Sequence, residues 1–98
     1  MSQLLVHYET VVRSSDGVGY IPSAWGRRAG DVWEGWIEFE PVDRKKERLR
    51  TGRETEQAGR DGLTYWAEGL TQVFLEGALE RAQRGTGSSE PPSPDVNP

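Results

Sequence analysis

The most concentrated group of chemically active side chains in the sequence is a basic run. Six cations stand here beside a single acid, Glu47; they are Arg44, Lys45, Lys46, Arg48, Arg50 and Arg53. Positive charge clustered in this way can bind nucleic acid or another anionic ligand, and Arg27 and Arg28 could join the patch. The run follows an acidic stretch over residues 31–43. We favour the alternative that the two stretches pair as neighbouring strands, because a neutralised stripe binds phosphate poorly.

Acid–base or metal chemistry would have to come from Glu54, Glu56 and His7, the last being the one histidine of the chain. The two glutamates would share one side of a continuing strand, and paired carboxylates can exchange protons or hold a divalent cation. A loop network that prepares the next helix is the favoured alternative. The chain has no cysteine and no phosphate-binding glycine loop or serine elbow. We therefore expect no metal or cofactor and rank a small enzyme as the weakest hypothesis.

Four tryptophans are many for 98 residues. Trp33 and Trp66 fall on apolar faces and are predicted to be core residues. Trp36 shares its strand face with glutamates, so either a helix covers it or it is exposed as an anchor for a partner. Because tryptophan is enriched at binding hot spots, Trp36 and the nearby Trp25 are candidate contact residues.

The N-terminal half has the two-residue periodicity of strands. Residues 4–13 predict one strand with a buried face that is formed by Leu4, Val6, Tyr8 and Val12. Residues 19–25 predict a weaker strand, in which Pro22 marks a sheet edge or an interruption. Residues 26–31 read as an exposed loop.

The best-patterned strand covers residues 32–40, where apolar and acidic residues alternate and only Trp36 breaks the acidic face. Residues 48–55 predict its hairpin partner. A register that pairs Glu38 with Arg50, and Glu40 with Arg48, brings opposite charges together. The same register aligns apolar residues on the other face, Phe39 with Leu49 and Ile37 with Thr51.

The last ordered part is predicted to be helical. Asp61 is the expected N-cap of a short helix that ends at Gly69, and Thr71 is the expected N-cap of a second helix; one bent helix is the alternative. Gly77 suggests close packing there, because glycine weakens a helix. The apolar face of this second helix comprises Phe74, Leu75, Ala78, Leu79 and Ala82.

These elements predict an α+β fold: a twisted antiparallel sheet of about four strands with the C-terminal helical segment packed on one face. We expect one domain over residues 1–84. Residues 85–98 are rich in glycine, serine and proline and predict a disordered tail.

Four segments of the chain read Trp-Glu-Gly-Trp-Ile-Glu-Phe (33–39), Arg-Glu-Thr-Glu-Gln (53–57), Tyr-Trp-Ala-Glu-Gly-Leu (65–70) and Leu-Glu-Gly-Ala-Leu (75–79). In this order they resemble a group of small uncharacterised bacterial proteins, over roughly residues 10–84. The resemblance implies a bacterial origin. It implies no activity, ligand or catalytic residue.

The net charge of −4 disfavours a general nucleic-acid binder. No apolar run reaches the ~20 residues of a membrane span and no secretory signal is seen, so we expect a cytoplasmic protein. The leading hypothesis is a non-catalytic protein that binds another protein or itself. Nucleic-acid or anionic-ligand binding is the alternative. The candidate binding residues are Trp25, Arg27, Arg28, Trp36, Arg48, Arg50, Arg53 and Glu54.

Overall fold

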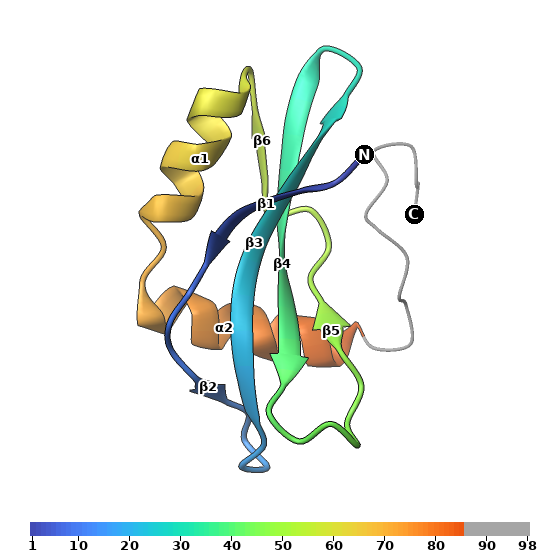
Figure 1. Cartoon of the computed structure of the whole chain (residues 1–98), viewed down its shortest axis with the longest axis vertical. Coiled ribbons are helices and arrows are strands. Elements are labelled where there is room, and N and C mark those ends of the chain that lie inside the picture. The colour runs from blue at the N-terminus through green and yellow to red at the C-terminus, as the bar shows by residue number, and fades with distance from the viewer. Residues whose placement is uncertain (86–98) are drawn as a thin grey trace.

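The computed structural model describes residues 1–85 and shows the expected α+β fold, an antiparallel sheet with two helices (Figure 1). The strands are β1 (Gln3–His7), β2 (Val12–Arg13), β3 (Gly19–Ala29), β4 (Val32–Pro41), β5 (Leu49–Arg50) and β6 (Thr55–Gln57). The helices are α1 (Arg60–Glu68) and α2 (Gln72–Arg84). The predicted tail lies, from residue 86 on, outside the described residues.

The long β3–β4 hairpin forms the centre of the sheet. A two-residue turn at Gly30 and Asp31 joins its strands, and the φ of 65° at Gly30 suits the first central position of a type II′ turn. The prediction of an exposed loop over residues 26–31 is therefore wrong for residues 26–29. Arg27 and Arg28 belong to β3 because β4 supplies a complete antiparallel partner up to Ala29.

β3 is an inner strand, so the prediction that Pro22 marks an edge is also wrong. The carbonyl of Pro22 accepts a hydrogen bond from the Tyr8 amide at 3.2 Å. Within a strand, the amide nitrogen and carbonyl of one residue face the same neighbour. The nitrogen of Pro22, which carries no hydrogen, therefore faces Tyr8, directly after the end of β1 at His7. The missing N–H thus falls outside the regular pairing of β1 with β3.

The N-terminal segment forms two short strands in place of the one predicted, and both pair with β3. The register shifts between Leu4 and Val6, so that Leu4 lies opposite Trp25 and Val6 opposite Ala24. One inserted residue reverses which face a side chain occupies. Leu4 consequently lies on the opposite face from Val6, not on the shared buried face that was predicted, and its side chain is 49% exposed.

The other side of the sheet confirms the predicted register, with Glu38 opposite Arg50 and Phe39 opposite Leu49. The predicted strand over residues 48–55 is split into β5 and β6, which both pair with β4. Backbone hydrogen bonds hold the connection against β4, from Thr51 to Ile37 and from Glu54 to Gly35.

Both helices pack on one face of the sheet, and Figure 1 shows α2 crossing behind the strands. Thr71 caps α2 as predicted, since its hydroxyl accepts a hydrogen bond from the Phe74 amide at 3.2 Å. Gly69 ends α1, but Gly59 and not Asp61 is its N-cap. The buried core between α2 and the sheet consists of Val12, Tyr20, Ile37, Phe39, Leu75, Ala78, Leu79 and Ala82.

A pair of glycines positions α1. Gly26 and Gly35 lie opposite each other on β3 and β4, and the fully buried Leu63 of α1 fills the hollow above them. A Cβ atom at Gly35 would come within 2.8 Å of Cζ3 of Trp66 and 2.9 Å of Cδ1 of Leu63. The helix reaches the sheet so closely because neither position has a side chain.

Gly77 of α2 differs from this pair. A Cβ atom there would meet only Nη1 of Arg81, at 3.6 Å. The prediction of close packing at Gly77 is wrong, and its glycine costs helix stability without a packing benefit.

We expect Gly35→Ala to lower the free energy of unfolding by about 1–3 kcal/mol, because the added methyl group overfills the hollow under α1. Gly77→Ala is the matched control. It should raise the free energy of unfolding by up to about 1 kcal/mol, because alanine is the better helix former. Urea unfolding of both variants measures the two effects. A neutral or stabilising Gly35→Ala would contradict the packing described for α1.

Tyr8 ties the N-terminal segment to α1. Its hydroxyl donates a hydrogen bond to the carbonyl of Ala67 at 2.5 Å. Burial raises the pKa of Tyr8 to about 12, because the charged phenolate is poorly solvated there. The folded protein therefore holds Tyr8 in its neutral form.

Stability should fall between about pH 10 and pH 12, because unfolded Tyr8 loses its proton near its ordinary pKa of about 10 while folded Tyr8 keeps it. Tyr8→Phe should remove this part of the pH dependence and cost about 1 kcal/mol at neutral pH for the lost hydrogen bond. Unfolding curves of both proteins at a series of pH values measure the difference. Identical slopes above pH 10 would show that Tyr8 ionises equally in the folded and unfolded states.

Candidate interaction face

Side chains of β3 and β4 alternate between two faces, and those that point away from α1 and α2 form what we call the helix-free face. Within residues 1–85, both helices lie on the other side of the sheet (Figure 1). The residues of β3 and β4 on the helix-free face include Ile21, Ser23, Trp25, Arg27, Glu34, Trp36, Glu38 and Glu40.

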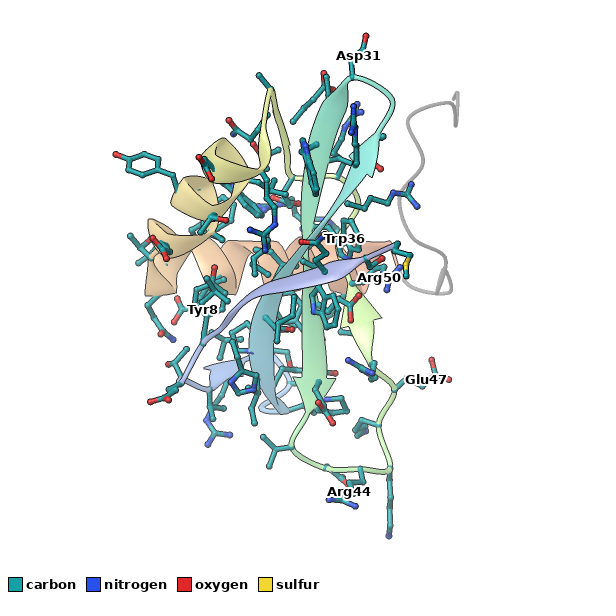
Figure 2. The ribbon with its side chains drawn as sticks, turned by 45° about the horizontal axis from the view of Figure 1, so that its top comes forward. Tyr8, Asp31, Trp36, Arg44, Glu47 and Arg50 are labelled. Carbon is teal, nitrogen blue, oxygen red and sulfur yellow. The ribbon has the colours of Figure 1, made fainter. Side chains whose placement is uncertain are left out.

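Trp36 lies at the centre of this face and is nevertheless fully buried. Its indole N–H donates a hydrogen bond to Oε2 of Glu38 at 3.0 Å. The guanidinium carbon atoms of Arg27 and Arg50 lie 6.0 and 5.5 Å from the centre of the indole ring, within the range of a cation–π interaction. Figure 2 shows Trp36 and Arg50 close together. Trp36 was predicted to be either covered by a helix or exposed. Both predictions are wrong, because charged side chains cover the ring.

Glu38 connects Trp36 to strand β5. It pairs with Arg50 directly across the strands, and Oε1 accepts a hydrogen bond from Nη2 of Arg48 at 3.3 Å. Arg48 was predicted to pair with Glu40, which is instead exposed. One carboxylate thus holds two arginines and an indole in place.

The charged side chains around Trp36 form what we call the charged cluster, which comprises Arg27, Glu34, Glu38, Arg48, Arg50 and Arg53. Within it, the side chain of Glu34 is completely buried. Oε1 accepts a hydrogen bond from Nε of Arg27 at 2.8 Å. Oε2 accepts no hydrogen bond from the described residues and lies 3.7 Å from Nη1 of Arg53, which also pairs with Glu56 at 3.2 Å. Glu34 and Glu38 together hold the arginines that surround Trp36.

The arrangement supports phosphate binding only weakly. Each arginine of the cluster already has a carboxylate partner, as the alternative to an anion-binding patch predicted. A phosphate chain would have to compete with these internal ion pairs, and burial strengthens a pair when both charges stay together. The cluster is better suited to fixing side-chain positions than to attracting nucleic acid.

The accessible apolar part of the helix-free face lies beside this cluster. Trp25 is opposite both Trp36 on β4 and Leu4 on β1, and it is partly exposed. Its indole N–H donates a hydrogen bond to the hydroxyl of Ser23 at 2.9 Å, which fixes the ring. Trp25 and Leu4 therefore form an accessible apolar patch on this face. The sequence pattern missed Leu4 because the bulge in β1 reverses its face.

The remaining predicted site residues lie elsewhere. Arg28 is opposite Trp33 near the tip of the hairpin, and its Nε donates to the carbonyl of Gly30 at 3.1 Å. Trp33 and Trp66, predicted to be core residues, are both only partly buried. Glu54 pairs with Arg81 of α2 at 2.5 Å. Neither Arg28 nor Glu54 contributes to the charged cluster.

The acid–base candidates do not come together. Glu54 pairs with α2, whereas Glu56 pairs with Arg53 next to the cluster, so the two do not share one side as predicted. His7 is an exposed residue of β1 opposite Ser23. Residues 1–85 contain no group of three or more histidine and carboxylate side chains that could hold a metal ion. Within the same residues, neither helix is long and apolar enough to cross a membrane.

Comparisons with known proteins add no assignment: no family model, curated protein or solved structure matches the chain. The site must therefore be interpreted from its own geometry.

Glu34→Ala should lower the free energy of unfolding by about 3 kcal/mol, because it removes the buried carboxylate that pairs with Arg27 and Arg53. Glu40→Ala on the same strand and face is the matched control and should change it by less than about 0.5 kcal/mol, since Glu40 is exposed. Urea unfolding distinguishes the two variants. Equal, small effects would show that the ion pairs of Glu34 do not support the fold.

Proposed function

We propose that this chain is a small non-catalytic interaction protein that binds a partner protein through its helix-free face. The observation that carries the proposal is the exposed patch of Leu4 and Trp25 beside a buried, internally paired cluster of arginines and glutamates. An exposed apolar patch next to ordered polar groups is typical of a binding surface.

The paired charges favour protein binding for a physical reason. Binding hot spots are enriched in tryptophan and arginine, and they lose affinity when side chains must be ordered on binding. Here Glu34 and Glu38 already order Arg27 and Arg50, so a partner would cover groups whose charges are satisfied. The same pairing weighs against the nucleic-acid alternative.

The proposal includes a location in the bacterial cytoplasm. The absence of cysteine fits a reducing compartment, and the resemblance described above implies a bacterial origin.

The proposal is tested with the full chain immobilised and incubated with lysate of the source organism, with and without nuclease treatment. We expect one protein to be retained at a stoichiometric level by the wild type and to be lost with Leu4→Glu and with Trp25→Ala. Both changes remove the exposed patch, and Leu4→Glu does so at a half-exposed side chain where the fold tolerates it. Mass spectrometry and circular dichroism report the retained protein and the fold.

Tyr65→Ala is the matched control, because it removes an exposed aromatic ring from α1, which lies on the opposite side of the sheet from Trp25. It should retain the same protein as the wild type. Retention by every variant would contradict the proposal. Loss of all bound material after nuclease treatment would instead favour nucleic-acid binding.

A further inference from the structure

A shallow groove lies at one end of the sheet, between the turn that precedes β3 and the loop that follows β4. Its volume is about 430 Å³, and its lining includes Val11, Val18, Gly19, Val42, Arg13 and Asp43. Volumes of this size accommodate a few side chains of a ligand. None of the residues of the charged cluster contributes to the lining.

The groove is open because Gly19 has no side chain. A Cβ atom at Gly19 would lie 3.0 Å from Cγ1 of Val11 and 3.6 Å from Cγ2 of Val42, so the two valines stand on either side of the glycine. Val11 is 44% exposed and Val42 is 58% exposed. Val12, the neighbour of Val11, is buried in the core beneath α2, so Val11 points to the helix-free side. The groove is thus an apolar end of that same face.

The lining of the groove contains Arg13 and Asp43, and the loop that continues from Asp43 carries further positive charge. Arg13, Arg44, Lys45 and Lys46 form no ion pair with any residue of the described part of the chain. Figure 2 shows Arg44 and Glu47 on the loop at this end of the molecule.

The acids at this end are mostly engaged by the turns themselves. Asp43 accepts a hydrogen bond from the Lys45 amide at 3.0 Å, and Asp16 accepts one from the Val18 amide at 3.3 Å and another from the Ser14 hydroxyl. Within the loop of residues 43–47, three cations, Arg44, Lys45 and Lys46, stand beside two acids, Asp43 and Glu47, in a chain whose net charge is −4. This loop is therefore locally positive.

We propose that the groove binds a short peptide segment of the partner in which an aliphatic side chain is flanked by acidic residues. The aliphatic group would lie between Val11 and Val42 over Gly19, and the carboxylates would face Lys45 and Lys46. A peptide fits better than a nucleic acid, because the lining contains no aromatic ring for base stacking. The inference rests on the proposed function, since the groove is part of the helix-free face.

The test uses a synthetic heptapeptide with a central leucine flanked on each side by glutamates, titrated into the isotope-labelled full chain. We expect the amide NMR signals of Val11, Gly19 and Val42 to shift as peptide is added and the shifts to reach a plateau. Val42→Asp should raise the dissociation constant about tenfold or more, because the change places a charge against the leucine. The exposed Val73→Asp on α2 is the matched control and should bind like the wild type.

The same titration tests the roles of the lysines in the protein and of the leucine in the peptide. Lys45→Gln with Lys46→Gln should weaken binding several-fold and flatten its salt dependence, whereas Arg28→Gln at the far hairpin tip should not. A peptide with alanine in place of leucine should bind more weakly. Absence of saturable shifts, or shifts that Val42→Asp leaves unchanged, would overturn the inference.

The two proposals fail separately. If the lysate partner depends on Leu4 and Trp25 but the heptapeptide does not bind, the proposed function stands and the groove is not the peptide site. If the heptapeptide binds at the groove but no lysate protein depends on Leu4 and Trp25, the proposed function is wrong.

Discussion

The structure depends on the burial of one tryptophan on a sheet face that neither helix of residues 1–85 covers. The two helices protect only one side of the sheet, so Trp36 must be shielded from water by its strand neighbours. Arginines provide this shield because their planar guanidinium groups cover the ring while remaining charged. Glu34 and Glu38 then become necessary, since partly buried guanidinium groups require carboxylate partners.

This constraint links the fold to the proposed function. Trp25 lies directly opposite the shielded Trp36 and remains partly accessible. On the other face, the hollow at Gly26 and Gly35 brings α1 against the sheet, and Tyr8 fastens the N-terminal segment to the same helix. One face thus packs against the helices, and neither α1 nor α2 covers the other.

The sequence predicted those parts of the fold that depend on periodicity. The alternation over residues 32–40, the register of Glu38 with Arg50 and the N-cap at Thr71 are all confirmed. The bulge after Leu4 was not predictable, because it inserts one residue and so interrupts the two-residue alternation. The strand character of Arg27 and Arg28 comes from pairing with β4 and leaves no local pattern.

The sequence predicted most of the residues of the candidate site but not how they contact one another. Alternation placed Trp36 among glutamates, and that pattern contained the signal for Glu34 and Glu38 as its partners. It could not show that arginines from β3 and β5 would cover the ring, because that contact joins residues distant in the sequence. The close approach of α1 to Gly26 and Gly35 is a similar case.

The central claim is that Trp36 is shielded by its charged neighbours while Trp25 beside it remains accessible. Fluorine NMR of protein labelled with 5-fluorotryptophan, with a soluble paramagnetic probe, tests both halves at once. Single tryptophan-to-phenylalanine variants assign the four signals. We expect the probe to broaden the Trp25 signal and to leave the Trp36 signal sharp. Equal broadening of both signals, or of neither, would contradict it.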